Sequence, residues 1–71
     1  MNKLKRHEAN EILCELFKRQ SETNDRRLGQ VLYTLLPARV SGIVHNTTND
    51  FYYWTDEIEV METFFRECVE D

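Results

Sequence analysis

The chain has 71 residues, two of them cysteines, and a formal net charge of -4. Its length predicts a single domain over residues 1–71, with a small core and a thin margin of stability. No apolar run approaches the roughly 18 residues that a membrane-spanning helix needs, and residues 1–12 lack the apolar segment of a secretion signal, so we expect neither a membrane protein nor a secreted one.

The charge is divided unevenly along the chain. Residues 1–39 contain eight Lys or Arg against five Asp or Glu, a net +3, whereas residues 40–71 contain one Arg against eight acids, a net -7. This division predicts a dipole that can steer a partner. Cys14 and Cys68 are too few for a disulfide-rich scaffold and form no CxxC motif. We therefore expect the protein to be located in a reducing cytoplasm, with both thiols free.

A first helix is predicted over residues 3–20. Its apolar stripe at helical spacing consists of Ala9, Ile12, Leu13, Leu16 and Phe17. His7, Glu11 and Cys14 share a stripe on the opposite side, and these residue types can ligate zinc. A fourth ligand would have to come from His45, Cys68 or a partner, and this side of a helix normally faces water. We therefore expect no metal site.

A second helix is predicted over residues 26–36, with Asp25 as its N-cap. Leu28, Val31, Leu32 and Leu35 form one apolar face, and Gly29, Tyr33 and Leu36 extend the apolar surface to a second side. A helix that is apolar on two sides is typical of the centre of a small bundle. Gly29 destabilises a helix interior by about 1 kcal/mol relative to Ala, so we expect it to let another backbone come close. Pro37 ends this helix.

Residues 37–54 are predicted to form an irregular connector, compatible with a short helical turn, a lone extended segment or a loop. The last helix is predicted over residues 56–69, with Thr55 as its cap and acids at its positive N-terminal end. Its predicted core face consists of Ile58, Met61, Phe65, Cys68 and Val69, and Val60 and Phe64 are left on a flank.

These elements together predict an all-α fold, a small three-helix domain with a long irregular connector before the last helix. The predicted core consists of Ile12, Leu13, Leu16, Phe17, Leu28, Val31, Leu32, Leu35, Ile58, Met61 and Phe65.

Two fragments resemble a group of short uncharacterised bacterial and phage proteins. "DRRLGQVLYTLL" carries Arg27, Leu28, Gly29 and Gln30, and "DFYYWTDEI" carries Phe51, Tyr52, Asp56 and Glu57. The group pairs an RLGQ helix with a downstream D-x-FY-x-x-D-x-E type motif at the start of a final helix. In this chain Thr55 stands where a capping acid is expected, and the spacer over residues 37–49 is longer. The resemblance covers about half the chain and implies a small helical fold in a bacterial or phage-infected cell. It implies no activity, because the group has none assigned.

Four consecutive aromatic residues, Phe51 to Trp54, precede the last helix. Four consecutive side chains cannot all point inward. Phe51 is predicted to plug the end of the bundle, and Tyr52 to bury its ring and hydrogen bond through its hydroxyl. Tyr53 and Trp54 are then the better candidates for contact with a partner.

No residue pattern typical of a catalytic site is found in the sequence. Nucleophilic catalysis needs a Cys or Ser beside a base, but His45 lies in a polar loop and Cys68 on the predicted core side of its helix. The two glycines form no phosphate-binding loop. We therefore expect no enzymatic activity and no cofactor.

Binding of nucleic acid through the basic N-terminal half is the alternative hypothesis. The cations that would carry it are Lys3, Lys5, Arg6, Arg26 and Arg27. Helix-turn-helix domains also carry basic residues at the start of their second helix. The net charge of -4 argues against this function, because a nucleic-acid-binding domain of this size usually carries a positive net charge.

The favoured hypothesis is a protein-interaction module that binds a protein partner or itself. An acidic last helix beside aromatic anchors has the composition of an interface. The predicted partner-binding residues are Tyr53, Trp54, Glu57, Val60, Phe64 and Glu67. Val60 and Phe64 are predicted to form the contact of a two-fold homodimer, because the core face does not need them.

Overall fold

The computed structural model describes residues 2–22 and 27–70. Its helices are α1 (Arg6–Glu22), α2 (Leu28–Leu35), α3 (Ala38–Val44) and α4 (Glu57–Thr63), and α4 continues directly into a π-helical turn, η1 (Phe64–Cys68). The predicted all-α class is confirmed, although the described residues contain four α-helices where three were expected. No helix in this part of the chain is long and apolar enough to cross a membrane.

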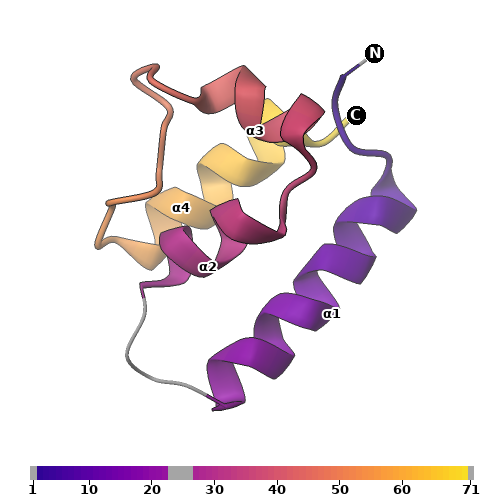
Figure 1. Cartoon of the computed structure of the whole chain (residues 1–71), viewed down its shortest axis with the longest axis vertical. Helices are drawn as coiled ribbons and strands as arrows, with labels where there is room; N and C mark the ends of the chain where they lie inside the picture. Colours follow the sequence, from indigo (N-terminus) through magenta and orange to yellow (C-terminus); the bar gives the residue numbers. More distant parts are fainter. Residues whose placement is uncertain (1, 23–26, 71) are drawn as a thin grey trace.

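The short helix α2 lies at the centre of the fold, as its two apolar sides predicted. It packs against both α1 and α4, while α3 packs on η1. In Figure 1, α1 and the α4–η1 pair run in opposite directions, so η1 ends near the start of α1. The amide of Leu4 donates to the carbonyl of Cys68 at 2.7 Å, and the amide of Glu70 donates to the carbonyl of Leu4 at 2.8 Å. These two bonds make a short parallel bridge between Leu4 and Val69, which ties the two ends of the described chain together.

The helix α3 corrects the expectation that residues 37–54 are irregular throughout. Pro37 ends α2, because the residue before it, Leu36, takes an extended conformation. Pro37 also begins α3, because the carbonyl of Pro37 accepts from the amides of Val40 and Ser41 at 2.9 and 3.0 Å. Val40 and Val44 lie one helical turn apart, and both are fully buried. The burial of these two valines holds α3, which has only seven residues, on the core.

The connector after α3 is irregular, as predicted, and the carboxylate of Asp50 organises it. Its Oδ2 accepts from the amide of Asn46 at 2.9 Å, and its Oδ1 accepts from the amide of Tyr52 at 3.2 Å. Asn46 has a φ of 59°, a left-handed conformation that Asn adopts more readily than most residues. These bonds fix the path by which the aromatic run enters the core.

The cap of the last helix is Asp56, and the prediction of Thr55 is wrong by one residue. The Oδ1 atom of Asp56 accepts from the amides of Ile58 and Glu59 at 3.0 and 3.2 Å. Its carboxylate therefore satisfies two of the free amides at the helix start and complements the helix dipole there. The other predicted cap, Asp25, lies outside the described residues.

The core is built by all four helices and by residues before and between them. Its fully buried apolar residues include Leu4, Leu16, Leu32, Val40, Val44, Phe51, Val60, Phe64 and Cys68. Of the predicted core, Leu16, Val31 and Leu32 are buried, and Ile12, Leu13, Leu28, Leu35 and Met61 are partly buried. The prediction is wrong for the three remaining residues, because Phe17, Ile58 and Phe65 are 66%, 72% and 48% exposed.

Candidate interaction surface

The two segments that carry the family resemblance meet in the folded chain. Arg27 donates through Nη1 to the carbonyl of Tyr53 at 3.0 Å, and Gln30 donates through Nε2 to the hydroxyl of Tyr52 at 3.1 Å. Between them, Gly29 faces the carbonyl group of Phe51 so closely that no Cβ would fit. The expectation that Gly29 admits another backbone is confirmed, and the start of α2 thereby positions the aromatic run.

The aromatic run divides into an inner and an outer part. Phe51 is fully buried, with its ring edge-to-face against Tyr33 at a centroid distance of 6.0 Å. Tyr52 is half-buried and meets Tyr33 edge-to-face at 5.4 Å, so Phe51 and Tyr52 have the structural roles that the sequence predicted. Trp54 packs partly against the core, whereas Tyr53 is 75% exposed. Only Tyr53 of the four presents most of its side chain to solvent.

The prediction for the core face of the last helix is confirmed for Cys68 and Val69, which are buried, and wrong for Ile58 and Phe65, which are exposed. Val60, Phe64 and Cys68 are fully buried, so the expectation that Val60 and Phe64 lie on an exposed flank is wrong. Val60 packs close to Gly29 of α2, at an ordinary van der Waals distance from where a Cβ would stand. The π-helical turn of η1 keeps Phe64 and Cys68 on this buried side although the helix widens there.

Burial of the other side leaves Ile58 and Phe65 facing outward. They lie seven residues apart, so they share one side of the α4–η1 pair, and half-buried Met61 lies between them. Phe65 lines a hollow with Arg6, Ala9 and Asn10 of α1. The half-exposed ring of Phe65 therefore lies beside the start of α1.

The helix α1 adds its own exposed ring to this surface. Phe17 is seven residues after Asn10, and half-buried Leu13 lies between them, so all three share the flank of α1 that faces Phe65. In Figure 1, α1 and the α4–η1 pair run in opposite directions, and Phe65 of η1 meets α1 near its start, at Arg6, Ala9 and Asn10. We call the surface formed by Leu13, Phe17, Ile58, Met61 and Phe65 the α1–α4 face.

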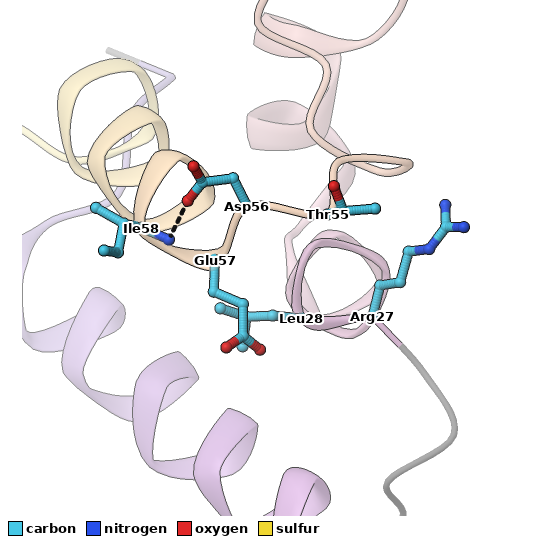
Figure 2. A pocket seen from close by; sticks show the side chains of 6 residues that line it. All are labelled: Arg27, Leu28, Thr55, Asp56, Glu57 and Ile58. Atoms are coloured by element: carbon cyan, nitrogen blue, oxygen red, sulfur yellow. Dashed lines mark hydrogen bonds between the residues drawn. The ribbon is translucent and has the colours of Figure 1, made fainter.

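A second hollow lies where α2 and α4 begin. Figure 2 shows its lining, with the carboxylate of Asp56 turned to the amide of Ile58 and the side chain of Thr55 turned away from the helix. The remaining lining residues are Arg27, Leu28, Glu57 and Ile58. Ile58 therefore lies where this hollow and the α1–α4 face adjoin, with the exposed carboxylate of Glu57 beside it.

The predicted partner-binding residues are not brought to one surface. Val60 and Phe64 are in the core, and the half-buried Glu67 accepts from Nε of Arg66 at 3.0 Å. Tyr53 and Glu57 are exposed, and Trp54 is half-buried. Sequence reasoning missed Phe17, Ile58 and Phe65 as surface residues because each lies on a helical stripe that is also a plausible core face.

The two cysteines differ sharply in environment. Both are free thiols, with Cys14 exposed on α1 and Cys68 buried in η1. Burial, with a smaller contribution from the neighbouring Glu67 carboxylate, raises the pKa of the Cys68 thiol to about 11. The reactive thiolate is therefore scarce at Cys68 near neutral pH, besides being inaccessible.

We expect a maleimide reagent at neutral pH to modify Cys14 alone in the folded protein and both cysteines after denaturation. Mass spectrometry of the intact chain and of its peptides gives the count and the position. Equal labelling rates at the two cysteines in native buffer would contradict the burial of Cys68.

The polar contacts outside the core are structural in character. Tyr33 and Nδ1 of His45 share a hydrogen bond of 2.9 Å, and partial burial together with the Asp50 carboxylate raises the pKa of the Tyr33 phenol. The carboxylate of Glu8 accepts from the amide of Lys5 and from Arg39, and these bonds lower its pKa. Across residues 2–22 and 27–70, no three His, Cys, Asp or Glu side chains are grouped so that they could hold a metal ion.

Two cations of the nucleic-acid hypothesis are engaged within the chain. Lys3 donates to the carbonyl of Arg66 at 3.4 Å, and Arg27 donates to that of Tyr53. Arg26 lies outside the described residues.

No family model, curated protein or solved structure matches this chain. Its candidate function therefore has to be argued from the geometry of its own surface.

Proposed function

We propose that this chain is a small protein-interaction module that binds a protein partner through the α1–α4 face. The observation that carries the proposal is the exposure of three large apolar side chains, Phe17 on α1 and Ile58 and Phe65 on the α4–η1 pair. Full burial of such a side chain stabilises a complex or a fold by about 1.5–3 kcal/mol relative to exposure. A chain of 71 residues has few apolar side chains to spare, so an interface is the most direct use of three large ones.

The composition of the surroundings supports the same function. The acidic helix α4 supplies Glu57, Glu59 and Glu62, all exposed, around the apolar residues. Apolar anchors rimmed by charged groups are typical of protein interfaces. The acidic last helix remains the binding element that the sequence predicted. Its apolar contact residues are Ile58 and Phe65, because Val60 and Phe64 are buried in the core. It places the module in a reducing cytoplasm of a bacterial or phage-infected cell, in keeping with two cysteines that form no disulfide.

The test is affinity capture from a lysate of the source cells with the tagged chain and three variants. Phe65→Glu and Ile58→Glu each place a carboxylate in the α1–α4 face, at positions where the wild-type side chains are 48% and 72% exposed. Tyr53→Glu is the matched control, since it removes an exposed aromatic side chain elsewhere.

We expect the wild type and Tyr53→Glu to capture at least one protein that Phe65→Glu and Ile58→Glu do not capture. An untagged copy of the chain itself counts as such a protein. Circular dichroism verifies that all variants are folded. The same captured set from all four chains would exclude this face as the binding site.

A further inference from the structure

We draw no further inference here: the strongest candidate, the group of exposed apolar side chains on the α1–α4 face (Phe17, Ile58 and Phe65), belongs to the surface already described, and nothing in the structure shows what covers it.

Discussion

Replacing Gly29 with alanine should unfold much of the protein or lower its melting temperature steeply. A Cβ at this position would overlap the carbonyl oxygen of Phe51, and that atom belongs to backbone which cannot rotate aside. Overpacking of a core typically costs about 1–3 kcal/mol and occasionally more, and a clash with backbone belongs at the upper end of this range. In a domain of this size each kcal/mol lowers the melting temperature by about 4–8 °C.

The matched control is Gly42→Ala. Gly42 lies in α3, is exposed, and has no atom within 4 Å of the position where a Cβ would stand. The same change should there stabilise the helix by roughly 0.5–1 kcal/mol, because alanine is the better helix former. Thermal melts followed by circular dichroism compare the two variants directly. Similar melting temperatures for both would mean that α2 and the aromatic run do not meet at Gly29.

Two adjacent phenylalanines of the last helix should give very different results when each is changed to alanine. Phe64 is fully buried, and removing its ring leaves a cavity in the centre of the core. Such changes cost about 3–5 kcal/mol, which is a large share of the 5–15 kcal/mol that stabilises a typical domain. We expect Phe64→Ala to be largely unfolded or to unfold at a much lower urea concentration.

Phe65→Ala is the control for that experiment. Its side chain is about half exposed and meets Phe64 edge-to-face at a centroid distance of 5.2 Å, so its removal should cost only about 1 kcal/mol within the monomer. Urea titrations at low protein concentration isolate this effect from any association. Greater damage from Phe65→Ala than from Phe64→Ala would show that the helix buries the face that the sequence predicted.

The sequence was informative where a residue type has one dominant use. Gly29 in an otherwise apolar helix predicted a close backbone approach, although the partner, Phe51, is 22 residues away and could not be read from local pattern. Pro37 predicted the end of α2 for the same reason. The cap of the last helix was within reach as well, since Asp is a better N-cap than Thr and Asp56 follows Thr55 directly.

The candidate surface was not predictable from periodicity. In the last helix Val60, Phe64 and Cys68 form one helical stripe, and Ile58, Met61 and Phe65 form another. A helix with two apolar stripes can bury either, and periodicity alone does not choose between them. The helix α3 escaped prediction because seven residues that include a glycine are too few to show a helical period.

The bridge between Leu4 and Val69 has a consequence for how the chain acquires its structure. Most contacts in a helical domain join near neighbours in sequence, but this one joins residues 65 positions apart. A nascent chain can form α1 and α2 as it emerges from the ribosome, yet Leu4 has no backbone partner until Cys68 and Glu70 have been synthesised. Closing so long a loop has a cost in chain entropy, so the final closure of the core has to follow synthesis of residues 68–70 and should be the slowest step of folding.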